Sequence, residues 1–454
     1  MEVDGDPHTA IHEPAMKWIS TRGSSPPITF IDALFAGTAP DGGLYMPERL
    51  DPLPPGTVDG LRGASIVEIG TTVGAHMLRD EITRQALEPL IREALDFAVP
   101  LVRVTERVSV LELFHGPTLA FKDVGARVQA RLLHHFTDGT PLMILVATSG
   151  DTGSAVAQAF HRVPDSRVVV LYPEGQVSDV QEAQMASLGD NITALAVRGT
   201  FDDCQRLVKQ AFADDALRAH VWLTPANSIN LGRLLPQVFY YFLLAGWRSN
   251  GAGDGPIVSV PSGNFGNLTA GLIAKRIGLP VAQFVAATNV NDAVPEYLRS
   301  GRYEPRPSIA TVANAMDVGA PSNFERVQAL YGNDLTALRR DITGFAYDDD
   351  RVIDEIGRVH RQYGYILDPH SAIAWLALQD RLAEDPAADG VFLATAHPAK
   401  FREVVEPAIG QRIELPHALA DALARPRRSL SMPADYGALE EFLRANAQSP
   451  EPQA

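Results

Sequence analysis

Residues 141–162 read PLMILVATSGDTGSAVAQAFHR and join an apolar run, a turn with two glycines and a helical pattern. The same order of apolar run and helical pattern recurs at 166–189, 191–212 and 256–278. Continuous apolar strands separated by helices are typical of parallel sheets that helices cover on both faces. The sequence therefore predicts an α/β core.

The chain has 454 residues, which is enough for two or three domains. Residues 1–100 show helical and loop patterns with proline-rich breaks, and they are expected to form an N-terminal domain. The core is expected over 101–432, with a smaller subdomain at about 131–223. Residues 433–454 are expected to be a C-terminal tail that frays at its end.

Composition argues against several classes of protein. The net charge is -16, and no Lys/Arg run is dense enough to neutralise a nucleic-acid backbone. No apolar stretch approaches the roughly 20 residues that cross a bilayer, and the acidic N-terminus is unlike a secretory signal. These features predict a cytoplasmic protein without nucleic-acid or membrane partners.

Cys204 is the only cysteine, so no internal disulfide can form, which suits a reducing compartment. It lies in the amphipathic pattern FDDCQRLVKQAF and is expected to be a small core or surface residue. No His/Cys/Asp cluster has metal-ligand spacing, so no metal site is expected.

Two glycine-bearing turns follow predicted strands. Ser149–Gly153 would present free N–H groups at the carboxyl end of a strand, which suits a carboxylate or phosphate, although glycines also serve ordinary turns. Ser262–Asn267 repeats the arrangement before a helix whose first turn lacks acidic residues. Its glycines would let the backbone approach a phosphate, and Asn264 and Asn267 add side-chain donors.

A third stretch, LTPANSINLGRLLPQ, groups Ser228, Asn230 and Arg233 before a helix. It is either a further anion site or an ordinary helix cap with a surface arginine.

Lys122 lies in LELFHGPTLAFKDVGAR, residues 111–127, between Phe121 and Asp123. Most lysines are solvated surface charges. A buried amine, in contrast, favours its neutral and nucleophilic form and suits a Schiff base with pyridoxal phosphate. A lysine in an apolar run together with a glycine- and asparagine-rich phosphate loop is the pairing that this cofactor needs.

Six motifs occur in this order: HGPTLAFKD, ATSGDTGSA, NSINLGR, PSGNFGN, DPHSAIA and ATAHPAKF. With STRG near Ser20 and DGGLYMPE near Asp41, they resemble the threonine synthases of the microbial and fungal type, from about Trp18 to Phe401. The resemblance implies a tryptophan synthase β-like fold (fold type II) with two parallel-sheet subdomains and a mainly helical N-terminal domain.

The resemblance also implies roles at the cofactor. Lys122 would be the Schiff-base lysine and the catalytic residue. The cofactor phosphate would be held by Gly263, Asn264, Phe265, Gly266 and Asn267. Thr395 would meet the pyridine nitrogen, and a hydroxyl there would temper the electron sink. An ordinary strand position remains the alternative for Thr395.

The implied substrate is O-phospho-L-homoserine, converted with water to L-threonine and phosphate. Thr148, Ser149 and Gly150 would bind its α-carboxylate, and Thr152, Ser228 and Arg233 its phosphate. Asp151 stands where many relatives of the wider fold carry asparagine beside the cofactor's 3′-oxygen. Two negative groups would repel there, so the role of Asp151 stays open.

Two rival functions remain open on the same residues. One is a phospho-lyase that releases a keto acid and ammonia, and the other is a catalytically silent protein that binds a phosphorylated metabolite. His115 and His397 are either proton relays or structural histidines, and His370 is expected to be a cap or contact at a helix start. The oligomeric state is expected to be a monomer or a homodimer.

Overall fold

The larger of the two sheets that form the core has six strands in the order β11-β10-β9-β12-β4-β3, in a computed structural model that describes residues 15–247 and 255–447. Neighbouring strands are parallel except for the antiparallel pair β3 and β4 at one edge. The strands are β3 (Leu101–Arg103), β4 (Val108–Glu112), β9 (Ile257–Pro261), β10 (Gln283–Thr288), β11 (Ile342–Ala346) and β12 (Gly390–Ala394).

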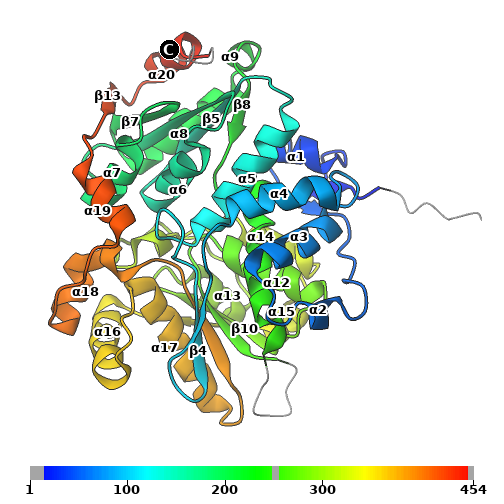
Figure 1. Ribbon diagram of the computed structural model, residues 1–454, viewed down its shortest axis with the longest axis vertical. Helices are drawn as coiled ribbons and strands as arrows, with labels where there is room; N and C mark the ends of the chain where they lie inside the picture. The colour runs from blue at the N-terminus through cyan, green and yellow to red at the C-terminus, as the bar shows by residue number, and fades with distance from the viewer. Residues whose placement is uncertain (1–14, 248–254, 448–454) are drawn as a thin grey trace, which may run out of the picture.

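The smaller sheet has five strands in the order β13-β7-β6-β5-β8, all of them parallel. They are β5 (Leu142–Ala147), β6 (Ser166–Pro173), β7 (Ile192–Arg198), β8 (Leu223–Pro225) and β13 (Ser429–Pro433). The smaller sheet occupies the upper half of Figure 1 and the larger sheet the lower half. The predicted α/β core with two parallel-sheet subdomains is therefore confirmed.

Helices cover both sheets. The four strand–helix units predicted from the sequence are present, with α6, α7, α8 and α12 as their helices. The helices of the core are α5 (Lys122–Phe136), α6 (Asp151–Phe160), α7 (Asp179–Ala186), α8 (Phe201–Ala213), α9 (Asp215–Arg218), α10 (Leu231–Leu234), α11 (Gln237–Tyr241), α12 (Gly266–Arg276), α13 (Ala293–Ser300), α14 (Phe324–Leu330), α15 (Leu335–Asp341), α16 (Asp349–Tyr363), α17 (Pro369–Glu384), α18 (Arg402–Ile409) and α19 (His417–Ala424). Three short 3-10 helices are η1 (Phe242–Gly246), η2 (Asn314–Met316) and η3 (Pro398–Phe401). None of the helices in the described part of the chain is long and apolar enough to cross a membrane.

The N-terminal region is mainly helical, as expected, and lies at the right of Figure 1. It contains β1 (Trp18–Ser20), α1 (Phe30–Ala36), β2 (Tyr45–Pro47), α2 (Thr57–Gly60), α3 (Ile66–Met77) and α4 (Arg84–Ala94). The glycines of α3 allow it to approach α11, because a Cβ on Gly70 or Gly74 would meet the ring of Phe239 at 3.1 or 3.3 Å. This region therefore packs directly on the core.

The C-terminal residues differ from the expected tail. β13 pairs with β7, and α20 (Tyr436–Ala445) packs on α8 with Leu439 and Leu443 fully buried. Two leucines four residues apart lie on one face of a helix, and this face closes the outer side of the smaller sheet. The end of the expected frayed tail, residues 448–454, and the acidic N-terminus lie outside the described residues. The domain boundaries at 100 and 432 stay predictions.

Candidate active site

Loops from both sheets meet where strands end at their carboxyl edges. In the larger sheet these loops follow the neighbouring strands β9, β12 and β4, and in the smaller sheet they follow β5 and β8. Ligand sites of α/β proteins form at such edges. All residues predicted for the site from the sequence lie in these loops or in the first turns of the helices that follow them.

Lys122 is the first residue of α5, and its side chain is only 15% exposed. The loop before it is tied to the end of β12, because the N–H of Phe121 donates to the carbonyl oxygen of Thr395 at 2.9 Å. Burial lowers the pKa of the Lys122 amine from its ordinary value. Asp151 opposes this shift, and the positive charges of Lys400 and Arg233 add to it. The surroundings of this amine therefore favour its uncharged form.

Asp151 lies between two lysines. Its carboxylate is 2.7 Å from Nζ of Lys400 and 3.6 Å from Nζ of Lys122, and it accepts a hydrogen bond from Gln181. Burial alone would raise the pKa of Asp151, but the two lysines outweigh burial and hold that pKa well below its usual range. The carboxylate of Asp151 is thus an anion that lies between two lysine amines, with Lys400 as the nearer one.

The first loop, residues 148–153, is organised by a threonine hydroxyl. Oγ1 of Thr148 accepts hydrogen bonds from the N–H groups of Gly150 and Gly153, both at 2.9 Å. Gly150 has a φ of 150°, which L-residues rarely adopt. Ser149 is exposed and Thr152 is half-buried, so both side chains remain accessible.

The second loop, residues 262–267, begins α12. Phe265 has a left-handed φ of 62°, and a Cβ on Gly263 would lie 2.6 Å from the carbonyl oxygen of Ala315. None of the hydrogen bonds among the described residues uses the N–H groups of residues 263–266. A tight turn with open N–H groups at a helix N-terminus suits a phosphate.

The asparagines of this loop hold it in place. Nδ2 of Asn264 donates to Oγ of Ser228 at 2.6 Å, and its Oδ1 accepts from the N–H of Ser322 at 2.6 Å. Nδ2 of Asn267 donates to the carbonyl oxygen of Pro261 at 2.7 Å. The side chain of Asn264 therefore joins the second loop to the third stretch.

The third stretch combines a cap with a buried arginine. Asn230 caps α10, as in one of the two readings of the sequence, and accepts from the N–H of Gly232. Arg233 is only 2% exposed, so the alternative that places this arginine on the surface is wrong. Its Nη1 donates to the carbonyl oxygen of Ala226, and its Nε has no partner in the described part of the chain. Burial lowers the pKa of Arg233 to about 10, against the opposing effect of Asp123.

The histidines near the site make hydrogen bonds with neighbouring groups. Nδ1 of His397 accepts from the N–H of Ala399, and burial lowers the pKa of His397. His115 contacts the carboxylate of Glu112 at 2.7 Å. His370 is the second residue of α17, and its Nε2 accepts from the N–H of Ala315, which confirms its position and contact role at a helix start.

Two buried cationic side chains, Lys400 and Arg326, were not predicted from the sequence. Lys400, quoted only as part of ATAHPAKF, is 3% exposed and reaches Asp151. Arg326 is fully buried, donates to the carbonyl oxygens of Tyr45 and Ile229, and is held by Asn323. Most of these partners cannot be seen in a linear sequence, because Asp151, Tyr45 and Ile229 lie far from Lys400 and Arg326 in the chain.

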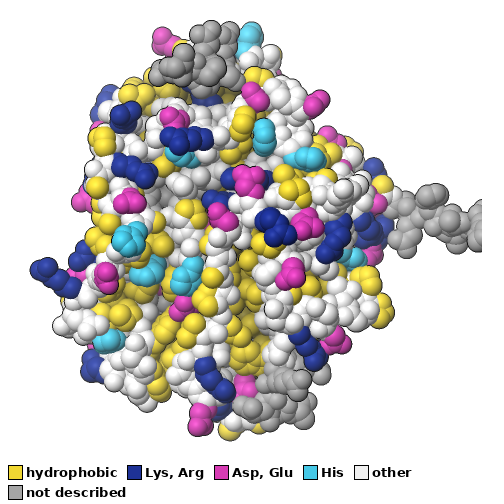
Figure 2. All heavy atoms as spheres, in the orientation of Figure 1, with side chains coloured by type: hydrophobic (Ala, Val, Ile, Leu, Met, Phe, Trp, Pro, Cys, Tyr) yellow, Lys and Arg dark blue, Asp and Glu magenta, His cyan; other side chains and the backbone are white. Residues whose placement is uncertain are grey.

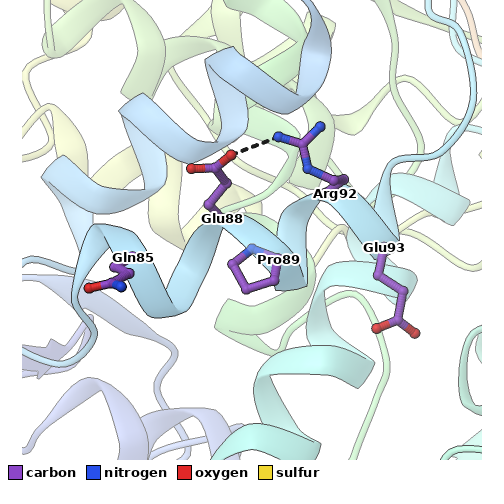
Figure 3. Close-up of a pocket in the computed structure, with 5 residues that line it drawn as sticks. All are labelled: Gln85, Glu88, Pro89, Arg92 and Glu93. Atoms are coloured by element: carbon purple, nitrogen blue, oxygen red, sulfur yellow. Dashed lines mark hydrogen bonds and ion pairs between the residues drawn. The ribbon is translucent and has the colours of Figure 1, made fainter.

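Other surface features do not coincide with this site. A shallow hollow on α4 is lined by Gln85, Glu88, Pro89, Arg92 and Glu93, with an ion pair between Glu88 and Arg92 (Figure 3). None of the predicted site residues lines it. Basic and acidic side chains are interspersed over the face shown in Figure 2.

The donor set fits pyridoxal phosphate. A buried amine of lowered pKa suits the aldehyde, and open N–H groups in a turn that has no room for a Cβ at Gly263 suit the phosphate. The hydroxyl-bearing Thr395 lies at the end of β12 beside the loop that carries Lys122.

Family models match three parts of the chain. Residues 100–395 match the family described as pyridoxal-phosphate dependent enzyme. Residues 17–95 match threonine synthase N terminus, and residues 371–443 match threonine synthase, C-terminal.

The chain is also similar to individual proteins. It is 43% identical to threonine synthase of Escherichia coli (strain K12) over 94% of this chain and 99% of that protein. The crystal structure of the Escherichia coli enzyme matches with a TM-score of 0.88 and 42% identity, covering 95% of this chain and 100% of that one. The structure of PLP-bound threonine synthase from Brucella melitensis matches with a TM-score of 0.89 and 38% identity, covering 96% and 100%. The fold and the predicted cofactor, pyridoxal phosphate, are thereby confirmed, and the chain belongs to the threonine synthase family of pyridoxal-phosphate-dependent lyases.

Proposed function

We propose that the enzyme converts O-phospho-L-homoserine and water to L-threonine and inorganic phosphate, with Lys122 as its catalytic lysine. The observation that carries this proposal is the buried amine of Lys122 beside Asp151, close to the three stretches that are predicted to bind anions. The single buried Cys204 suits a cytoplasmic enzyme.

Lys122 would hold the cofactor aldehyde, and the N–H groups of residues 263–267 would hold the cofactor phosphate. Asn264 supports this role by fixing the turn between Ser228 and Ser322. Thr395 would contact the pyridine nitrogen. When bound, pyridoxal phosphate supplies an electron sink for the negative charge that develops on the substrate.

The substrate would lie between the first loop and the third stretch. Its α-carboxylate would bind at Thr148, Ser149 and Gly150, where Thr148 already fixes the loop. Its phosphate would bind at Thr152, Ser228 and Arg233. The Nε of Arg233 supports this placement, because a buried guanidinium N–H that has no partner among residues 15–247 and 255–447 favours an anion.

Lys122 would also move the protons of the reaction. Its free amine would remove the proton from the substrate α-carbon and later return one there. The same amine would then remove a proton from the β-carbon as the phosphate leaves from the γ-carbon, where Arg233 would stabilise its charge. A proton is delivered to the γ-carbon, and water adds at the β-carbon. Closure of the smaller subdomain over the larger would exclude bulk water during these steps.

Product analysis tests the reaction. Purified enzyme incubated with O-phospho-L-homoserine should release L-threonine and phosphate in equal amounts. A keto acid and ammonia in place of threonine would identify a phospho-lyase instead. No product at all, with no visible cofactor absorbance, would favour a silent metabolite-binding protein.

The role of Lys122 has a matched control on the surface. Lys122→Ala should abolish turnover and should lose the covalent attachment that borohydride fixes between cofactor and chain. Lys209, an exposed lysine on α8, provides the control, and Lys209→Ala should retain both. Covalent fixing at another residue in Lys122→Ala would contradict the assignment. Whether the enzyme is a monomer or a homodimer stays a prediction that light scattering can test.

A further inference from the structure

Lys400 is a buried lysine that the reaction outlined above does not use. It lies in η3, just after β12 of the larger sheet, and its side chain is 1% exposed. Its ammonium group donates to the carbonyl oxygen of Thr118 at 3.0 Å and pairs with Asp151 at 2.7 Å. Asp151 belongs to α6 of the smaller sheet, so the pair also crosses between the two sheets.

Removing an ammonium group from water is costly, and an ion pair of this kind contributes little net stability compared with apolar residues. A buried pair next to a reactive group is therefore better explained by an electrostatic role. Lys122 lies on the other side of the Asp151 carboxylate at 3.6 Å. The Asp151 carboxylate therefore lies between two amines, and the shorter of the two contacts is the one to Lys400.

Three charged side chains on neighbouring elements act on the amine of Lys122. Asp151 faces the Lys122 amine from α6, Lys400 faces it from η3 and Arg233 from α10. Of these three, only Asp151 favours the charged form of Lys122. The next residue of α5, Asp123, is engaged by the N–H and hydroxyl of Thr118. Without Lys400, the carboxylate of Asp151 would act on Lys122 alone, and a like charge that disfavours protonation of Lys122 would be gone.

We propose that Lys400 is a positioning residue that takes up the charge of Asp151, so that the amine of Lys122 stays uncharged and able to bind a carbonyl carbon. The part of the proposal that concerns binding of a carbonyl carbon rests on the proposed catalytic role of Lys122. The electrostatic effect itself concerns three side chains and holds whatever the substrate.

The test measures the Lys122 amine directly. Full-length protein, freed of cofactor with hydroxylamine, is labelled with trace acetic anhydride over a range of pH, and peptide mass spectrometry follows the acetylation of Lys122. The exposed Lys209 serves as the internal reference. Four variants are compared with the wild type: Lys400→Met, Lys400→Arg, Asp151→Asn and the double variant Lys400→Met/Asp151→Asn.

Lys400→Met should raise the pKa of Lys122 by about one unit or more, which slows its acetylation near neutral pH about tenfold relative to Lys209. Asp151→Asn should lower the pKa of Lys122. The double variant should lie between Asp151→Asn and the wild type, because without Asp151 only the direct effect of Lys400 on Lys122 remains and the Lys400→Met shift is smaller. Lys400→Arg should retain most of the wild-type behaviour. In the protein as purified, Lys400→Met should also lose bound cofactor faster during dialysis.

An unchanged labelling profile of Lys122 in folded Lys400→Met would overturn the proposal. The proposal would also be overturned if Lys400→Met shifted the pKa of Lys122 equally in the wild type and in Asp151→Asn. If Lys400→Met does not fold, the comparison of Asp151→Asn with the double variant replaces it, because adding Lys400→Met to Asp151→Asn must still raise the pKa of Lys122. The labelling uses neither cofactor nor substrate. Its failure leaves the threonine assay of the wild type standing, and a failed threonine assay leaves the labelling result standing.

Discussion

Replacing Gly263 by alanine tests whether the second loop is the cofactor cradle. The added Cβ would lie 2.6 Å from the carbonyl oxygen of Ala315 and 2.8 Å from Cα of Met316, where ordinary contacts begin near 3.4 Å. The backbone of Ala315 cannot easily retreat, because its N–H donates to His370, whose Nδ1 contacts Asp368 at 2.6 Å. The loop itself must therefore move.

Forcing a methyl group into a packed site costs about 1–3 kcal/mol. Without cofactor the loop can relax, so the cost falls mainly on binding, and cofactor affinity should fall by roughly fivefold to 150-fold. Titration of the cofactor-free protein with pyridoxal phosphate, followed by visible absorbance, measures this change. Thermal unfolding of the cofactor-free protein should change little.

Gly60 is the matched control, because it ends α2 and a Cβ there would meet no atom within 4 Å. Gly60→Ala should bind the cofactor like the wild type. Wild-type affinity in Gly263→Ala would refute the reasoning. A loss of stability of about 1–3 kcal/mol in cofactor-free Gly263→Ala would also refute the reasoning. The loop would then be rigid even without its cofactor.

Three further predictions concern the rest of the molecule. Leu439→Ala should lower the free energy of unfolding by about 2–5 kcal/mol in urea titrations, because Leu439 is fully buried, whereas Leu430→Ala at a 52% exposed position should change it by less than about 0.5 kcal/mol. Burial raises the pKa of Cys204 to about 12, so iodoacetamide should label the thiol only after denaturation, and labelling of the native protein would contradict its burial. The hydrogen bond from Ser20, with backbone donors, lowers the pKa of Asp41 from 3.8 to about 2, so its stabilising effect is complete above the unfolded pKa and is lost as pH falls towards 2. The difference in melting temperature between wild type and Asp41→Asn should shrink over that pH range, and a constant difference would show that the charge of Asp41 plays no part.

The strand–helix order of the core could be predicted because each buried parallel strand is a continuous apolar run. β6 is expected and observed over residues 166–173, and β5 and β7 differ from the expected runs by one or two residues. β13 could not be predicted in this way. Only Met432 among its residues is buried, so its place comes from backbone pairing with β7 and not from an apolar pattern.

The candidate site likewise contains residues that could be predicted from the sequence and residues that could not. Lys122 and the glycine-bearing loops could be found because local chemistry marks them, as a lysine in an apolar run and as turns after strands. Lys400 carries no such mark, since its burial depends on Asp151 from the other sheet. Buried charge pairs are set by tertiary structure, and a single sequence gives no view of which distant side chains meet.

The pairing of β13 with β7 bears on how the protein is made. Translation produces β7 long before residues 429–433, so this edge of the smaller sheet waits unpaired while more than half of the chain is still being synthesised. Open strand edges invite pairing with other chains. A strand that is made long after β7 therefore closes this edge, and messages that end before codon 429 would yield a protein prone to aggregate.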